Sequence, residues 1–147
     1  MLDFDINSLP SPCYVLDEAL LEKNLKILKS VMDRTGCSIL LAQKAFSMYC
    51  EYPLIGKYLS GTTASSLFEA QLGKEMAGEV HIFAPAYRED EIDEILECCD
   101  HIVFNSVEQW LRYKEKVLAM KKRKHIECGL RINPEYSEIE VDLYNPC

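Results

Sequence analysis

The chain has 147 residues, of which 48% are hydrophobic and 27% are charged, which is enough apolar material for one globular core. Its formal net charge of −8 argues against a nucleic-acid-binding surface, because phosphate backbones select basic patches. No apolar run approaches the length of a membrane span, and the N-terminus lacks the pattern of a signal peptide, so we expect a cytoplasmic protein.

Helical and extended segments alternate along the chain. Asp17 can cap a helix over residues 17–34, and Gly36 follows its end. One face of that helix carries an apolar stripe of Leu21, Leu25, Leu28 and Met32. After it, the sequence predicts strands at residues 38–43, 61–64, 80–84, 101–104 and 125–132, separated by helical segments at residues 48–59, 66–77, 89–99 and 106–120.

The strands lack polar alternation and are joined by helices, which indicates an α/β fold with a parallel sheet covered on both faces. An open doubly wound sheet and a (β/α)8 TIM-type barrel both satisfy this order. No glycine-rich phosphate turn follows the first strand, which weakens the nucleotide-binding form of the open sheet. Because a closed barrel needs about 250 residues, we expect residues 1–147 to form a partial (β/α)8 barrel, with about the first five strands, in an N-terminal fragment.

Lys44 follows the first predicted strand and is the candidate nucleophile. An ammonium placed where a buried strand opens into a loop is partly desolvated, which favours the neutral amine that forms a Schiff base. The alternative is a strand-end lysine that simply reaches solvent. Catalytic groups in barrels lie at the C-terminal ends of the strands. The other residues at such ends are Ser65, Pro85, Asn105 and Arg131.

Histidines and cysteines give no metal-binding pattern. His81, His101 and His125 fall at strand starts, at the end of the sheet opposite Lys44, and their wide spacing lacks the i, i+4 or H-x-H geometry of ligands. We therefore expect structural histidines and no metal site. Seven cysteines include no C-x-x-C pair, and without a secretion signal they are expected to be reduced thiols, mostly filling the core.

Four segments carry a family resemblance. In one group of enzymes, the entry segment resembles residues 11–17 (SPCYVLD), and the first-strand lysine motif resembles residues 41–45 (LAQKA). The second strand and its helix in that group are similar to residues 61–69 (GTTASSLFE), and the fifth strand is similar to residues 130–132 (LRI). That group is the fold-type III pyridoxal-phosphate enzymes, which include alanine racemase and the ornithine and diaminopimelate decarboxylases.

Further segments resemble one family within that group. They are residues 44–47 (KAFS), 84–87 (APAY), 102–106 (IVFNS), 130–135 (LRINPE) and 143–147 (LYNPC). These segments are most similar to the carboxynorspermidine/carboxyspermidine decarboxylase family. The likeness covers essentially the whole chain but only the first part of such an enzyme.

The resemblance implies a pyridoxal 5'-phosphate cofactor carried by Lys44, with Arg131 as a second cofactor-binding residue. For Arg131 a structural ion pair is the open alternative. The implied reaction is decarboxylation of carboxynorspermidine or carboxyspermidine to norspermidine or spermidine in polyamine biosynthesis, by an enzyme that is a homodimer. The substrate is then a small polyamine-type amino acid, with no nucleic acid or membrane as a partner.

In the same family the phosphate loop, the acidic partner of the pyridine nitrogen and a second β-domain come later in the chain. We therefore expect the fragment itself to be inactive. Two alternatives stay open: another fold-type III amino-acid decarboxylase or racemase, acting on diaminopimelate or ornithine, and a non-catalytic relative that binds pyridoxal phosphate.

Overall fold

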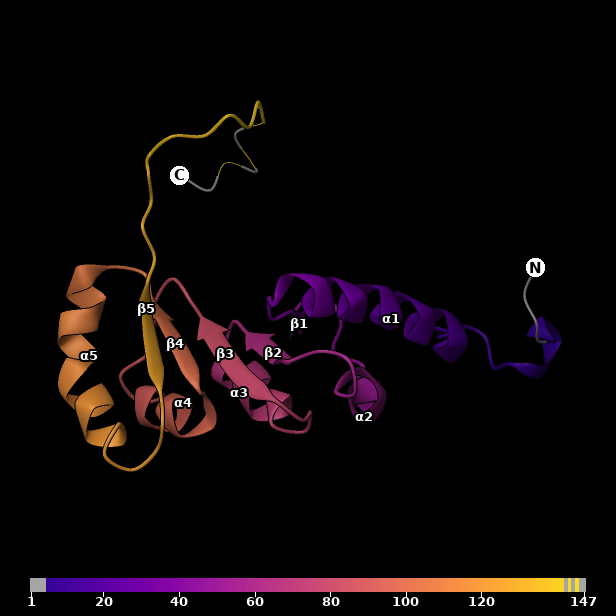
Figure 1. The fold of residues 1–147 in the computed structure, drawn as a ribbon, viewed down its shortest axis with the longest axis horizontal. Coiled ribbons are helices and arrows are strands. Elements are labelled where there is room, and N and C mark those ends of the chain that lie inside the picture. Colours follow the sequence, from indigo (N-terminus) through magenta and orange to yellow (C-terminus); the bar gives the residue numbers. More distant parts are fainter. Residues whose placement is uncertain (1–4, 142, 144, 146–147) are drawn as a thin grey trace.

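A parallel sheet organises the residues that the computed structural model describes, which are residues 5–141, 143 and 145. Its strands lie side by side in chain order (Figure 1), and they are β1 (Leu40–Ala42), β2 (Gly61–Ala64), β3 (Glu79–Phe83), β4 (His101–Phe104) and β5 (Glu127–Leu130). A doubly wound sheet would reverse this order at a switch point. The five sequential parallel strands therefore confirm the α/β prediction and exclude the doubly wound order among the described residues.

Helices provide the connections that parallel pairing requires. The crossover helices are α3 (Leu67–Gly73), α4 (Ile92–Cys98) and α5 (Val107–Met120). The remaining helices are η1 (Ile6–Ser8), α1 (Glu18–Thr35), η2 (Tyr49–Glu51) and α2 (Tyr52–Ile55). Among the described residues, none of these helices combines the length and the apolar character needed to cross a membrane.

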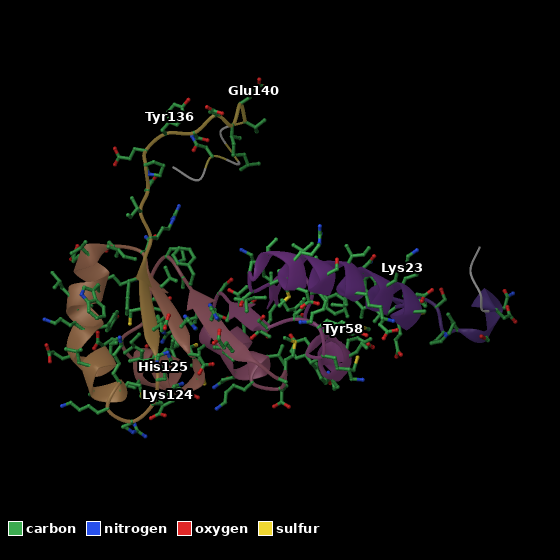
Figure 2. All side chains as sticks on the ribbon, viewed as in Figure 1. Lys23, Tyr58, Lys124, His125, Tyr136 and Glu140 are labelled. Atoms are coloured by element: carbon green, nitrogen blue, oxygen red, sulfur yellow. The ribbon has the colours of Figure 1, made fainter. Side chains whose placement is uncertain are left out.

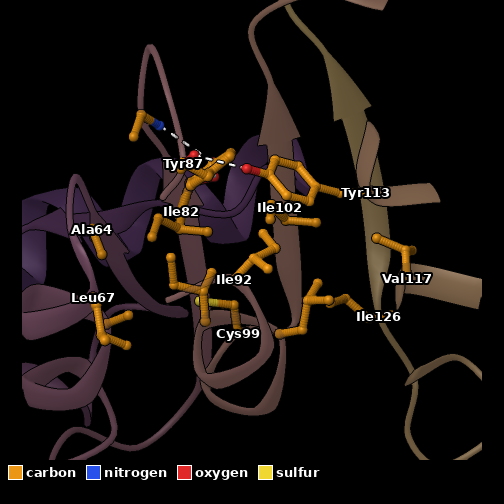
Figure 3. Packing of buried hydrophobic residues seen from close by; sticks show 14 of the residues in the cluster. Ala64, Leu67, Ile82, Tyr87, Ile92, Cys99, Ile102, Tyr113, Val117 and Ile126 are labelled. Carbon is orange, nitrogen blue, oxygen red and sulfur yellow. Dashed lines mark hydrogen bonds between the residues drawn. The ribbon is translucent and has the colours of Figure 1, made fainter. Parts of the chain in front are cut away.

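The main core lies between the sheet and the crossover helices. Side chains alternate between the two faces of a strand. Ile82 of β3 and Ile102 of β4 are at most 1% exposed and pack with Ile92 of α4 (Figure 3). The adjacent His81 and His101 are half-buried and belong to the opposite face. One face of the sheet is thus apolar and covered by helices, whereas the other carries a mixture of polar and apolar side chains, such as His81 and Phe83.

Tyr87 and Tyr113 tie the sheet to α5 inside this core. The Tyr87 hydroxyl donates to the carbonyl oxygen of Val103 at 2.8 Å. The Tyr113 hydroxyl donates to the carbonyl oxygen of Tyr87 at 2.9 Å (Figure 3). Burial raises the pKa of Tyr87 far above its ordinary value, so the phenol stays a neutral donor. The two bonds give buried phenol groups the hydrogen-bond partners that such groups need.

A second apolar cluster holds α1 and α2 at the β1 edge of the sheet. Leu25 of α1 is buried against Tyr52 of α2. The Tyr58 hydroxyl donates to the Glu22 carboxylate at 2.5 Å and so lowers the pKa of that carboxyl. Leu28, predicted to face the core, is instead 38% exposed. Leu21, Leu25 and Met32 of the same stripe do pack in the cluster, although α1 extends past the sheet (Figure 1).

A buried amide fixes the end of β1. Gln43 is 1% exposed; its Nε2 donates to the carbonyl oxygen of Glu69 at 2.7 Å, and its Oε1 accepts from the Tyr52 hydroxyl at 3.1 Å. Burial raises the pKa of Tyr52, and the Glu69 carboxylate adds to the rise. The two bonds connect β1, α2 and α3 at the residue that precedes Lys44.

The predicted elements are present with some ends displaced, except that the helix predicted at residues 48–59 is divided into η2 and the short α2 and ends at Ile55. Strands 61–64 and 101–104 are found as predicted, and the Asp17 side chain accepts from the Leu20 N–H at 3.0 Å as the cap of α1. Strands 38–43 and 125–132 shorten to β1 and β5, because each is an edge strand with one partner. The helix predicted from residue 89 begins at Ile92, because the Arg88 side chain binds Asp90 in the preceding turn.

The chain leaves the sheet after β5. Residues 131–141 extend away from it, with Tyr136 and Glu140 far from the helices (Figure 2). Of the family-like segment at residues 143–147, Tyr144, Pro146 and Cys147 lie outside the described residues.

The thiols are free but mostly at the surface. The six described cysteines form no disulfide, as predicted. Only Cys99 among them is fully buried, and burial raises the pKa of its thiol to about 12. The prediction that cysteines mostly fill the core is wrong for Cys13, Cys37, Cys50 and Cys128, which are exposed. Their positions in turns, helix ends and the edge strand β5 explain the exposure.

Replacing Gly61 should destabilise the sheet strongly. Gly61 has φ 153° at the start of β2, and a Cβ there would overlap the backbone of Glu79 in β3. We expect Gly61→Ala to lower the free energy of unfolding by about 2–5 kcal/mol through backbone strain and overpacking. Gly36, with φ 73° and nothing within 4 Å of its Cβ position, is the matched control. Gly36→Ala should cost only about 1–2 kcal/mol in urea denaturation, and equal losses would contradict the prediction.

Removing the Tyr52 hydroxyl measures how much its hydrogen bond with Gln43 contributes to stability. Tyr52→Phe leaves the Gln43 amide oxygen buried without its partner, so we expect a loss of about 1–3 kcal/mol in the free energy of unfolding. Tyr49, which is 67% exposed, is the matched control. Tyr49→Phe should change stability by less than about 0.5 kcal/mol. Similar urea midpoints for the two variants would mean that the Gln43–Tyr52 bond contributes nothing.

Candidate active site

The residues that follow the five strands form one rim of the sheet. They are Lys44, Ser65, Pro85, Asn105 and Arg131, each within two residues of a strand end. Because the strands are parallel and adjacent, these positions share one edge, here called the strand-end rim. The rim gathers the residues that the sequence placed at the C-terminal ends of strands, where barrels hold their catalytic groups.

Lys44 lies in a tight turn directly after β1. The Gln43 N–H donates to the Thr63 carbonyl oxygen at 3.3 Å, and the Ala45 N–H donates back to the Ala42 carbonyl oxygen at 3.0 Å. The chain therefore leaves the sheet at Gln43, and Lys44 is exposed. The predicted partial burial of its amine is not found among the described residues, because the turn begins one residue before the lysine.

A cavity of about 90 Å³ lies beside Lys44. The small side chains of Ala42 and Ala64 leave the space open, and Thr63 and Ser65 bring hydroxyl groups to it. Its complete lining is Ala42, Lys44, Thr63, Ala64, Ser65 and Phe83. A primary amine, two hydroxyls and an aromatic ring thus meet at the ends of β1, β2 and β3.

Arg131 lies at the end of β5, the edge strand opposite β1, and its side chain points toward the same cavity. Its guanidinium carbon lies 5.6 Å from the centroid of the Phe83 ring, which lines the cavity, and its Nη1 donates to Asn105 Oδ1 at 3.2 Å. The Arg131 N–H also donates to the carbonyl oxygen of Phe104 at 2.9 Å. The two residues predicted to bind a cofactor, Lys44 and Arg131, are therefore on one rim with Phe83 between them.

Two helices of the rim begin with the same hydrogen-bonded turn. At α3 the Ser66 hydroxyl accepts from the Glu69 N–H at 3.3 Å, and the Glu69 carboxylate accepts from the Ser65 N–H at 2.6 Å. At α5 the Ser106 hydroxyl accepts from the Gln109 N–H, and the Gln109 amide oxygen accepts from the Asn105 N–H at 2.8 Å. These are reciprocal capping interactions, and they fix the backbone of Ser65 and Asn105.

At the opposite ends of the strands, the structure brings together residues that the sequence analysis kept apart. The rings of His81 and His101 stack with centroids 3.9 Å apart. Both face Glu79, whose Oε2 lies 3.0 Å from His81 Nε2 and 3.3 Å from His101 Nε2. The signal was in the strand register, which pairs His81 with His101, and not in their spacing along the chain.

Comparisons with known proteins point to one kind of enzyme, although no family model matches the chain. The chain is 46% identical over 143 residues to a carboxyaminopropylagmatine decarboxylase of Synechocystis sp.. It is 41% identical to a carboxynorspermidine/carboxyspermidine decarboxylase of Campylobacter jejuni, and 39% identical to one of Herminiimonas arsenicoxydans. The alignments cover 97%, 93% and 92% of this chain, respectively, but only 36%, 35% and 36% of those proteins.

A solved structure agrees with these relatives. The carboxynorspermidine decarboxylase of Campylobacter jejuni, crystallised with norspermidine, superposes with a TM-score of 0.81 at 38% identity, covering 90% of this chain and 35% of that one. The predicted partial barrel fold is thereby confirmed. The chain spans about a third of the length of the proteins it matches. Over nearly all of its own length, the chain is similar to carboxynorspermidine/carboxyspermidine decarboxylases.

Proposed function

We propose that this chain forms the N-terminal part of the barrel of a pyridoxal-phosphate-dependent decarboxylase that acts on a carboxylated polyamine. The carrying observation is Lys44, which lines a cavity at the C-terminal ends of parallel strands in a chain 39–46% identical to such decarboxylases. The remaining parts of the enzyme belong to the two thirds of the relatives' length that the chain does not match.

The residues of the strand-end rim fit a pyridoxal phosphate cofactor. When bound, this group supplies an aldehyde for a lysine amine and a conjugated ring that accepts the electron pair left by departing carbon dioxide. Lys44 is the amine that would hold it, since it is the lysine among the cavity's lining residues. Phe83 offers an apolar surface to a flat ring, and the Thr63 and Ser65 hydroxyls offer hydrogen bonds to polar groups.

Arg131 would place a positive charge beside the reacting centre. Asn105 orients the guanidinium through the 3.2 Å bond to Nη1, so its position does not depend on a ligand. A fixed cation suits an anionic oxygen of the cofactor or the substrate carboxylate. Because Lys44 is exposed here, we propose that the surfaces which close over its amine come from the rest of the enzyme or from a second subunit.

The substrate class follows from the relatives. Their names specify carboxyaminopropylagmatine, carboxynorspermidine or carboxyspermidine, and the similar crystal structure holds norspermidine. All of these are polyamine-like molecules. We therefore propose a polyamine that carries a carboxylate on the carbon next to an amino group, which the enzyme converts to the free polyamine in polyamine biosynthesis. We also propose a cytoplasmic homodimer.

Borohydride trapping tests the role of Lys44. The purified chain is incubated with pyridoxal phosphate, reduced with borohydride and mapped by peptide mass spectrometry. We expect the cofactor mass on Lys44 at concentrations that leave the exposed Lys57 and Lys74 unmodified. Lys44→Ala should abolish the preferred labelling and Lys57→Ala should leave it unchanged. Equal labelling of the three lysines would remove the basis for the cofactor proposal.

Carbon dioxide release tests the reaction in the longer enzyme that carries this chain. We expect release from carboxynorspermidine, carboxyspermidine or carboxyaminopropylagmatine and none from diaminopimelate or ornithine. Lys44→Ala should reduce the rate by about 10⁴-fold or more, the scale on which loss of a covalent nucleophile acts. Release from diaminopimelate or ornithine alone would favour a different decarboxylase. Lysine labelling without release from any substrate would favour a non-catalytic relative.

A further inference from the structure

We propose that Glu79, His81 and His101 form a binding site for a divalent transition-metal cation of the zinc type. The site lies at the starts of β3 and β4, at the end of the strands opposite Lys44. It is independent of the proposed decarboxylase function, because it shares no residue with the strand-end rim.

The register of the sheet assembles the three ligands. Glu79 and His81 are two residues apart on β3, so their side chains emerge on the same face. His101 is the partner of His81 on β4. This face lies opposite the buried side chains of Val80 and Ile82, which pack into the core under the helices. The ligand atoms therefore meet on the face of the sheet that the helices do not cover.

The distances suit a metal ion. One carboxylate oxygen and two imidazole nitrogens lie within 4.8 Å of one another. Glu79 Oε2 is 3.0 Å from His81 Nε2 and 3.3 Å from His101 Nε2. Ligand bonds of about 2.0–2.1 Å in a tetrahedral zinc site place the ligand atoms about 3.3 Å apart. Two histidines and one glutamate are a known zinc ligand set that leaves a fourth position for water.

A second carboxylate supports this assignment. Glu127 Oε2 of β5 lies 3.6 Å from His101 Nδ1, the ring nitrogen that faces away from Glu79. Histidine ligands usually donate their second ring N–H to a carboxylate, which orients the ring and increases its basicity. The carboxylates of Glu79 and Glu127 would together supply the negative charge that balances a divalent cation.

Binding requires one small movement. The His81 and His101 rings are stacked with an interplanar angle of 11°. A cation lies near the plane of each imidazole that binds it, so one ring must rotate before both nitrogens can reach the same ion. Imidazole nitrogens favour zinc, cobalt and nickel over magnesium and calcium, which prefer oxygen ligands. We therefore expect zinc-type selectivity and a loss of the stacked geometry on binding.

Zinc titration of the 147-residue chain, followed by calorimetry under reducing conditions, tests the site. We expect saturable binding that falls about tenfold or more in His81→Ala and in His101→Ala, and about 10–100-fold in Glu127→Gln. Cys37→Ala is the control, because Cys37 is an exposed potential zinc ligand that lies outside the ligand triplet. Its affinity should equal that of the unchanged chain. Circular dichroism establishes that each variant is folded.

X-ray absorption at the zinc edge separates the site from the exposed thiols. The proposal requires nitrogen and oxygen neighbours at about 2.0–2.1 Å, and sulfur at about 2.3 Å would show that cysteines hold the ion. Three results would each overturn the proposal. They are sulfur neighbours, no saturable zinc binding, or a zinc affinity in the folded His81→Ala and His101→Ala variants equal to that of the unchanged chain. Magnesium should give no saturable binding, and equal affinity for magnesium would contradict the nitrogen ligands.

Discussion

The in-register pairing of parallel strands is the constraint on which the rest of the structure depends. Each crossover helix returns the chain to the same edge, so every strand begins at one end of the sheet and finishes at the other. Lys44 and Arg131 are thereby placed on one rim, although they lie far apart in the sequence. The same pairing places His81 beside His101 at the opposite end. The two groups of polar residues are consequences of one backbone arrangement.

Much of the fold could be predicted because its signals are local. The apolar residues 102–104 located β4, and Asp17 and Gly36 located the ends of α1. The helix before β4 was less well located, since the side chain of Arg88 closes on Asp90 and delays its start. The exposure of Leu28 was not predicted either, because the apolar stripe of a helix does not show which of its members contact a neighbour.

The candidate site was predictable in position but not in environment. Strand ends and family-like segments located Lys44 and Arg131, and both lie on the rim. The contact of Arg131 with Phe83 depends on strands two places apart in the sheet, which no local pattern encodes. Gln43 looked like the last residue of a strand, and only the packing of α2 and α3 shows its two buried hydrogen bonds. The contact between His81 and His101 could not be predicted from their spacing along the chain, because only the strand register brings the two residues together.

The paired caps at the starts of α3 and α5 have a consequence for the charge that the rim can offer. A free helix start is a natural cradle for an anion, because its unpaired N–H groups point outward. Here Glu69 and Gln109 already occupy the N–H groups of Ser65 and Asn105, and at α3 the occupant is itself a carboxylate. Because the Glu69 carboxylate lies at the start of α3, an anion that approaches Lys44 is attracted by side-chain cations such as Arg131 more than by that helix start. The attraction of an anion to this rim therefore depends on individual side chains, which can be substituted one at a time without a change in the backbone.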